Sequence, residues 1–175
     1  MKTERHVRKS NIFVEGRYRF GVNEQRILLS VISKIKISDV EFKPYRLQWK
    51  YLKKITSNHY KNADDFNSAC ERLKNKTVII RDGDKQHGFG FLSGWTIEPG
   101  KWIDFRVDPC MKEMLLDLLQ EGKFTLYKLE CILGLGSSYS IRLYELLKAN
   151  EWKQQPVEIR LDDLKWKLGV EPGKK

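Results

Sequence analysis

The 175-residue sequence predicts an α+β protein built on a winged helix-turn-helix, with a complete first domain followed by the beginning of a second. Three observations predict this fold. Amphipathic helical patterns are followed by short β-branched and aromatic runs that turn sequences separate. The basic residues are concentrated in the first third of the chain. A pattern of the first part returns in weak form near the C-terminus.

The excess of positive charge lies at the N-terminal end. The chain has 33 Lys and Arg against 23 Asp and Glu, and residues 1–61 hold 15 and 5 of these. A merely well-solvated surface would spread the charge evenly, whereas concentrated basic charge is typical of proteins that bind polyanions. No stretch approaches the roughly 18 apolar residues that span a bilayer. We therefore expect a cytoplasmic protein that binds nucleic acid and no membrane.

The first element is a basic, polar arm over residues 1–22. Asn23 can then cap a helix, because apolar residues recur after it at helical spacing and lie on one face. These residues are Ile27, Leu28, Val31, Ile32 and Ile35. We expect this helix in the core of a first winged-helix domain over residues 23–122, which would contact DNA and dimerise.

A helix-turn-helix follows. The segment Phe42–Leu47 contains Pro44 and suits an edge strand, and Trp49–Ile55 has the pattern of a basic helix. After a polar turn, Asn62 and Asp65 form a capping box that opens a second helix. This helix runs to about Asn75, and its inward residues would be Ala63, Phe66, Ala69, Cys70 and Leu73.

Three β-branched or aromatic runs predict an antiparallel meander after this helix. The runs are Thr77–Arg81, Phe89–Ile97 and Trp102–Val107. Asp108 and Pro109 are then typical of a helix start, and Gly122 is typical of a helix end. The helix between them would close the first domain with Met111, Met114, Leu115, Leu118 and Leu119.

A weak internal repeat predicts a second winged helix over residues 123–175. Arg26 precedes the pair Arg46-Leu47 by 20 residues, and Arg142 precedes Arg160-Leu161 by 18. Ser137 or Ser138 can cap the helix that holds Arg142. The second copy stops where the first continues, so we expect this second domain to be truncated.

The helix that begins at Asn62 is the one that such a fold presents to DNA, and the next hairpin forms the wing. Its outward amides, hydroxyls and cations are groups that bond to phosphates and base edges. Flanking cations add candidate phosphate contacts. The predicted DNA-binding residues are Lys50, Lys53, Lys54, Lys61, Asn67, Ser68, Arg72, Lys74, Lys76, Arg81 and Lys85. Any single one suits an ordinary solvated surface equally well, and their clustering is what indicates DNA binding.

An RNA-binding alternative rests on the segment His87-Gly-Phe-Gly-Phe-Leu92. It resembles the RNP1 stretch of RNA-recognition motifs, and Ile12-Phe-Val14 faintly resembles RNP2. The two stretches lie about 70 residues apart, however, and Gly94 stands where RNP1 has an aromatic residue. We therefore expect Phe89 and Phe91 to pack beneath the wing.

The sequence predicts no enzyme, no cofactor and no metal site. Gly134-Leu-Gly-Ser-Ser138 lacks the lysine of a P-loop, and Asp82-Gly-Asp84 is primarily a hairpin signal. The histidines form no His-x-His pair; they are His6, His59 and His87. The cysteines stand far apart and are expected to be small buried residues in a reducing cytosol; they are Cys70, Cys110 and Cys131.

Several motifs resemble those of the initiator Rep proteins of iteron-controlled plasmids. The most specific is Tyr139-Ser-Ile-Arg-Leu-Tyr-Glu-Leu-Leu-Lys148, followed by a matching segment from Ile159 to Leu168. The others are Lys9-Ser-Asn11, Asn23-Glu-Gln-Arg-Ile-Leu-Leu29 and Arg72-Leu-Lys-Asn-Lys-Thr-Val78. Together they cover nearly the whole chain.

The resemblance implies two tandem winged helices that bind origin repeats as a monomer to start replication. As a dimer, such proteins repress their own gene, and they recruit host replication proteins. The second domain supplies most of the base reading in this family. The resemblance thus implies backbone contacts for Arg72, Lys74 and Lys76, and dimer contacts in the strands between Phe89 and Val107. The alternatives that remain are a dimerisation module with an incidental basic surface and the RNA-binding domain.

Overall fold

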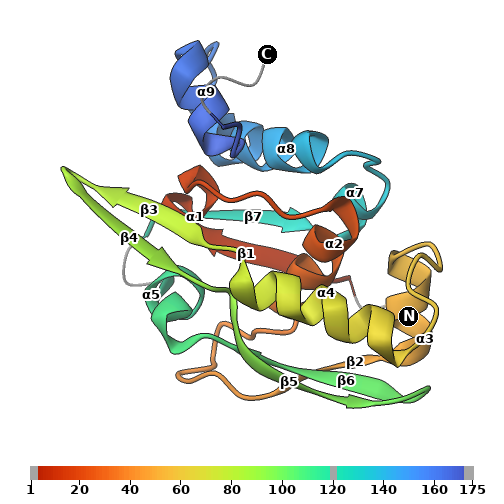
Figure 1. Ribbon diagram of the computed structural model, residues 1–175. Coiled ribbons are helices and arrows are strands. Elements are labelled where there is room, and N and C mark those ends of the chain that lie inside the picture. The colour runs from red at the N-terminus through yellow and green to blue at the C-terminus, as the bar shows by residue number, and fades with distance from the viewer. Residues whose placement is uncertain (1–3, 119–121, 172–175) are drawn as a thin grey trace.

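The structure is a computed structural model that describes residues 4–118 and 122–171. An α+β body carries a projecting two-stranded hairpin on one side, and a C-terminal helical segment lies at the opposite end from the three-stranded sheet (Figure 1). Within the described segments, no helix is long and apolar enough to cross a membrane.

The N-terminal segment is part of the core. Strand β1 (His6–Ser10) pairs antiparallel with β7 (Phe124–Lys128), and α1 (Asn11–Glu15) follows with Ser10 as its N-cap. Phe13 is fully buried, and Phe20 is nearly so. The prediction of a polar arm over residues 1–22 is therefore wrong for this segment, because basic residues alternate with buried apolar ones along an extended chain.

The pairing of β1 with β7 also joins the two sides of the predicted boundary at residue 122. Helix α7 (Glu130–Leu133) and helix α8 (Ser138–Asn150, capped by Ser137) follow β7. Ile132 and Ile141 belong to the same buried cluster as Ile27. The predicted boundary thus cuts a sheet and a continuous core. Gly122 has the left-handed φ of 66° that was expected there, but the chain has no domain boundary at this residue.

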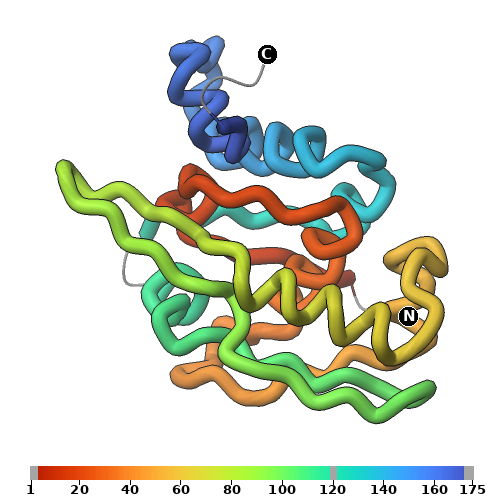
Figure 2. Tube along the Cα trace, viewed as in Figure 1, coloured from red at the N-terminus to blue at the C-terminus, as the bar shows by residue number. Residues whose placement is uncertain are grey.

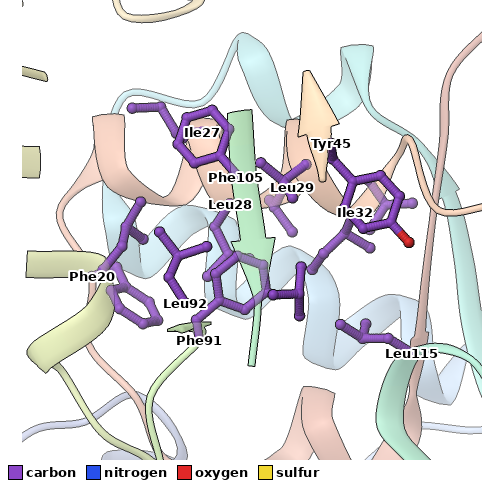
Figure 3. Close-up of a cluster of buried hydrophobic side chains, with 14 of the residues drawn as sticks. Phe20, Ile27, Leu28, Leu29, Ile32, Tyr45, Phe91, Leu92, Phe105 and Leu115 are labelled. Atoms are coloured by element: carbon purple, nitrogen blue, oxygen red, sulfur yellow. The ribbon is translucent and has the colours of Figure 1, made fainter. Parts of the chain in front are cut away.

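The helix-turn-helix matches its prediction closely. Helix α2 (Val22–Ile32) begins after Gly21, two residues before the predicted cap Asn23. Strand β2 (Tyr45–Gln48) lies at a sheet edge, and α3 (Trp49–Ile55) and α4 (Ala63–Asn75) follow. Asn62 caps α4 as predicted. Figure 3 shows Ile27, Leu28 and Ile32 of α2 in the central cluster, beside Phe105 of β6.

The predicted meander is instead two separate sheets. Strands β3 (Val78–Asp82) and β4 (Lys85–Phe89) form the projecting hairpin, whereas β5 (Leu92–Glu98) pairs with β6 (Trp102–Val107) in the order β2-β6-β5. The predicted run from Phe89 to Ile97 is broken at Gly90. A Cβ there would lie 2.4 Å from the carbonyl oxygen of Lys74, so the chain passes closer to the end of α4 than a side chain allows. The tube in Figure 2 shows the chain leaving the hairpin for the lower sheet at this point.

The helix predicted after Asp108 is short. The Asp108 side chain accepts a hydrogen bond from the amide of Cys110, and the turn η1 (Pro109–Met111) leads into α5 (Lys112–Leu115). Met111, Met114, Leu115 and Leu118 are buried as expected. Leu119, also predicted for this helix, lies outside the described residues.

The C-terminal segment repeats the helix and turn of α3. After α8 and the short η2 (Glu151–Lys153), helix α9 (Leu161–Lys167) ends in the same pattern of backbone hydrogen bonds. In α3 the amides of Thr56, Ser57 and Asn58 bond to the carbonyls of Leu52, Lys54 and Lys53. In α9 the amides of Leu168, Gly169 and Val170 bond to the carbonyls of Leu164, Trp166 and Lys165. Ser57 (φ 52°) and Gly169 (φ 70°) are both left-handed, so α9 ends in the same way as the first helix of the helix-turn-helix.

Candidate DNA-binding surface

The turn between α3 and α4 is fixed by its own hydrogen bonds. The Thr56 hydroxyl donates to the carbonyl of Leu52 at 2.8 Å. At the start of α4, the Asn62 side chain accepts from the Asp65 amide at 2.9 Å, and the Asp65 carboxylate accepts from the Lys61 amide at 2.6 Å. Capping of this kind satisfies amides that a helix start leaves free. Helix α4, about 20 Å long by its 13 residues, is therefore held at a defined angle to α3.

One face of α4 packs on the body. Phe66, Ala69, Cys70 and Leu73 are buried, as predicted. The predicted DNA contact Asn67 lies on the side toward β5: its carbonyl accepts from the Trp95 indole at 3.0 Å, and its amide donates to Glu71 at 2.9 Å. Asn67 therefore joins α4 to the sheet, with one N–H and its carbonyl oxygen already engaged.

Arg72 and Lys76 share a single buried carboxylate. Glu24 accepts from Arg72 Nε at 2.5 Å, from Lys76 Nζ at 2.7 Å and from the Gly21 amide at 2.8 Å. Burial alone would raise the pKa of Glu24, but the hydrogen bonds from Lys76, Gly21 and Arg72 outweigh it and lower the pKa. These two cations therefore tie α4 to α2, and the single carboxylate neutralises part of their charge.

The other cations of the helix-turn-helix are free of such pairing. Lys50, Lys53 and Lys54 line a shallow hollow on α3 beside Asn58 and Gly100. Ser68 and Lys74 are exposed on α4, and Lys61 is exposed just before it. Among the described residues, none of these lysines has a carboxylate oxygen within 4 Å of its ammonium group. The structure thus places unpaired positive charge at both ends of α4.

The wing carries the remaining predicted contacts. It extends directly from the C-terminal end of α4 (Figure 1), and Lys85 is exposed next to its tip, where Gly83 has a φ of 57°. Arg81 is exposed on β3, and its guanidinium carbon lies 3.9 Å from the centre of the Trp166 ring in α9. Two further arginines were missed from the sequence: Arg17, whose backbone bridges Ile79 of the wing, and exposed Arg19, whose guanidinium carbon lies 5.4 Å from the centre of the Tyr139 ring. Their alternation with buried Tyr18 and Phe20 is the signal that could have identified them.

A buried charged cluster lies behind this surface, where β1, β7 and α8 meet. Glu145 accepts from Lys9 at 2.7 Å, from Arg142 at 3.0 Å and from the Tyr127 hydroxyl at 2.5 Å. Tyr18 completes the cluster with hydrogen bonds to all three charged groups. Burial lowers the pKa of Lys9 to about 8, although Glu145 opposes the shift. Burial would raise the pKa of Glu145, but Lys9 and Arg142 lower it to about 2.

The structure gives the RNA alternative little support. Phe91 is fully buried, and Phe89 is half-buried against the core, so the two rings pack as expected and Phe91 cannot stack on a base. Phe89 is the last residue of β4, and Phe91 lies in the connection to β5, which belongs to a different sheet. Of the cysteines, Cys70 is buried as predicted, but Cys110 and Cys131 are exposed, contrary to prediction. In the described segments, no group of three or more His, Cys, Asp or Glu side chains is placed to hold a metal ion.

Comparison with known proteins gives one family and a structural likeness. Residues 6–148 match the family described as initiator replication protein, WH1. A solved structure similar to this chain is the crystal structure of Pi initiator protein in complex with iteron DNA, with a TM-score of 0.73 and 14% sequence identity over 96% of this chain and 74% of that one. At this identity the likeness shows the fold, which confirms the winged-helix prediction. No curated protein matches the chain.

Proposed function

Because this chain belongs to the initiator replication protein family, whose WH1 model it matches over most of its length, we propose that it binds repeated sequences of double-stranded DNA at a plasmid origin to start replication. The family membership makes it an origin-binding initiator. The helix-turn-helix and wing contact the phosphate backbone, and base reading falls mainly to the second domain, of which this chain holds only the beginning. The DNA complex of the Pi initiator protein supports duplex DNA as the ligand.

One observation carries the proposal: unpaired cations extend from α3 along α4 to the wing. They are Lys50, Lys53, Lys54, Lys61, Lys74, Arg81 and Lys85. Lysines bind phosphates as point charges, and Arg adds a planar set of donors. The amides and carboxylates of α4 are largely committed to its packing, because Asn67 and Asp65 hold internal hydrogen bonds. Such a surface positions a protein on DNA and reads little sequence.

Fluorescence anisotropy tests the proposal directly. The chain is titrated with a duplex carrying origin repeats, a scrambled duplex and single-stranded RNA at several salt concentrations. We expect both duplexes to bind with little preference, and the log of affinity to fall by about 0.9 per neutralised phosphate for each unit of log salt. Preference for RNA, or absence of binding to either duplex, would contradict the proposal.

A matched pair of variants assigns the binding to this surface. Lys53→Ala removes one unpaired cation of the hollow on α3 and should reduce the salt slope by up to about 0.9. Lys43→Ala removes a lysine that already pairs with Asp39 at 2.8 Å. Lys43→Ala should leave the slope unchanged. Equal effects of the two changes would show that net charge alone drives binding.

A second candidate function is dimerisation through the β5 edge. Strand β5 forms one edge of the three-stranded sheet, and a free edge offers unpaired backbone groups to a second copy. A dimer formed at this edge fits repression of the protein's own gene, which the family resemblance implies. The monomer, in this proposal, binds the origin and recruits host replication proteins. Sedimentation velocity with and without duplex DNA distinguishes the two functions. A tight dimer that does not bind duplex DNA would favour a dimerisation module over the initiator.

A further inference from the structure

Arg81 and Trp166 form a contact between the wing and α9. The guanidinium carbon lies 3.9 Å from the ring centre, a distance at which the cation is attracted to the face of the ring. A guanidinium stacked in this way keeps its in-plane N–H groups free to donate to a phosphate. In the described segments, no carboxylate oxygen lies within 4 Å of the Arg81 guanidinium. Its donors therefore remain available.

A second stacked arginine shows the contrasting arrangement. The guanidinium carbon of Arg46 lies 3.6 Å from the centre of the Trp102 ring. Its Nε and Nη2 each donate a hydrogen bond of 2.7 Å to the Asp104 carboxylate. The carboxylate uses the donors and cancels the charge. Both arginines stack on a tryptophan, but of the two it is Arg81, on the wing, whose N–H donors are not taken up by a carboxylate.

Trp166 is itself held in place by α9. Leu164 and Leu168 pack against Val14 and Leu146 of the body. Arg142 donates to the carbonyl of Lys167 at 3.2 Å, and the Lys167 ammonium lies 3.6 Å from Glu15. These contacts do not involve Arg81, and they fix the position of the helix from which Trp166 projects.

We propose that Trp166 is a positioning residue that holds Arg81 as a preformed phosphate contact, so that the first wing and the first helix of the second unit form one DNA-binding surface. This inference rests on the proposed function. A long arginine side chain loses conformational freedom when it binds a phosphate, and stacking on a fixed ring removes part of that loss beforehand. Two carboxylates, Glu15 and Asp163, line a pocket together with Arg81 and Trp166. Glu15 lies 3.6 Å from the Lys167 ammonium, so Asp163 is the one whose charge most opposes a bound phosphate.

A double-mutant cycle on duplex DNA tests the inference. Trp166→Ala should weaken binding about two- to fivefold, the effect of an exposed cation–π contact, and Trp166→Phe should restore most of the loss. In an Arg81→Ala background, Trp166→Ala should have no further effect, because the group that it positions is gone. Asp163→Asn should strengthen binding, and only where Arg81 is present.

The controls separate this inference from general effects. Trp102→Ala removes the ring beneath Arg46, whose charge is already neutralised, and should leave the affinity unchanged. Equal weakening by Trp166→Ala in both backgrounds would overturn the inference, since a loosened α9 acts whether or not Arg81 is present. The inference would also be overturned if the wild-type chain binds duplex DNA and Trp166→Ala leaves the affinity unchanged. Failure of the wild-type chain to bind any duplex would instead refute the proposed function.

Discussion

Arg26 and Arg142 each link a longer helix to the end of a seven-residue helix in the same way. Each is the fifth residue of its helix, α2 or α8. Arg26 donates to the carbonyl of Ile55, the last residue of α3, and Arg142 donates to the carbonyl of Lys167, the last residue of α9. One arginine thus holds the end of α3 and the other the end of α9, which gives the weak sequence repeat a physical basis.

The first prediction concerns Arg142. Arg142→Lys keeps the charge beside Glu145 but cannot reach the carbonyls of Val14, Gly16 and Lys167 together, which Arg142 Nη2 now does. Each lost hydrogen bond to a charged group costs about 1.5–3 kcal/mol, so we expect at least about 2 kcal/mol less stability in urea unfolding. Hydrogen exchange should show faster exchange of the α9 amides. Arg26→Lys is the matched control and should accelerate exchange at the end of α3 instead. An α9 that exchanges equally slowly in Arg142→Lys would contradict this role.

Glu24→Gln separates the structural and DNA-binding uses of Arg72 and Lys76. The amide can still accept from the Gly21 backbone, but it no longer neutralises the two cations. We expect a loss of about 1–2 kcal/mol of stability together with tighter and more salt-dependent binding to duplex DNA. Weaker DNA binding from a variant that still folds would mean that Glu24 positions the two cations for DNA.

Gly90→Ala tests the close approach that separates the wing from the sheet. The new methyl group would meet the Lys74 carbonyl oxygen at 2.4 Å, a backbone atom that cannot rotate away. Forced overpacking of this kind costs about 1–3 kcal/mol, which thermal unfolding would show. Gly134→Ala is the control, since a Cβ there meets no atom within 4 Å. Equal stability of the two variants would refute the steric explanation.

Phe91→Ala distinguishes a core ring from a base-stacking ring. The side chain is fully buried, so its removal should cost about 3–5 kcal/mol in chemical unfolding. A folded, fully stable variant that loses binding to single-stranded RNA would revive the RNA-recognition alternative.

The sequence predicted the helix-turn-helix well because local signals determine it. The apolar spacing of α2 and the capping pair of Asn62 and Asp65 are both local. The cap was confirmed, and α2 was confirmed with its ends shifted: it begins after Gly21 and ends at Ile32, three residues before the predicted Ile35. The strand order could not be read in this way, since the pairing of β1 with β7 joins residues more than a hundred positions apart. The break at Gly90 depends on a contact with the end of α4, which no local pattern reports.

The candidate site was harder to predict, because charge alone does not reveal its partner. Arg72 and Lys76 were predicted as DNA contacts, yet both bind Glu24, and Lys9 was assigned to a solvated arm, yet it is buried against Glu145. These partners come from distant parts of the chain. Four of the motifs that resemble the Rep proteins meet in these two networks: Glu24 with Arg72, and Lys9 with Glu145. They therefore hold the fold, and the unpaired lysines stand largely outside them.

The last prediction concerns acid stability, which Glu145 should dominate. Its pKa is about 2 in the folded protein, because the attraction of Lys9 and Arg142 outweighs burial, and near 4.5 when unfolded. Between these values the unfolded chain binds more protons, so stability is full above pH 4.5 and falls as pH drops toward 2, by on the order of 3 kcal/mol. Urea unfolding across this range should show the loss. Glu145→Gln should flatten the profile and cost about 3–5 kcal/mol at neutral pH by leaving buried cations unpaired. Lys9→Met, which keeps the Arg142 pair, should cost less, and Glu4→Gln, which breaks only the exposed pair with Lys128, should leave the profile unchanged. A wild-type profile that is flat from pH 5 to 3 would refute the prediction.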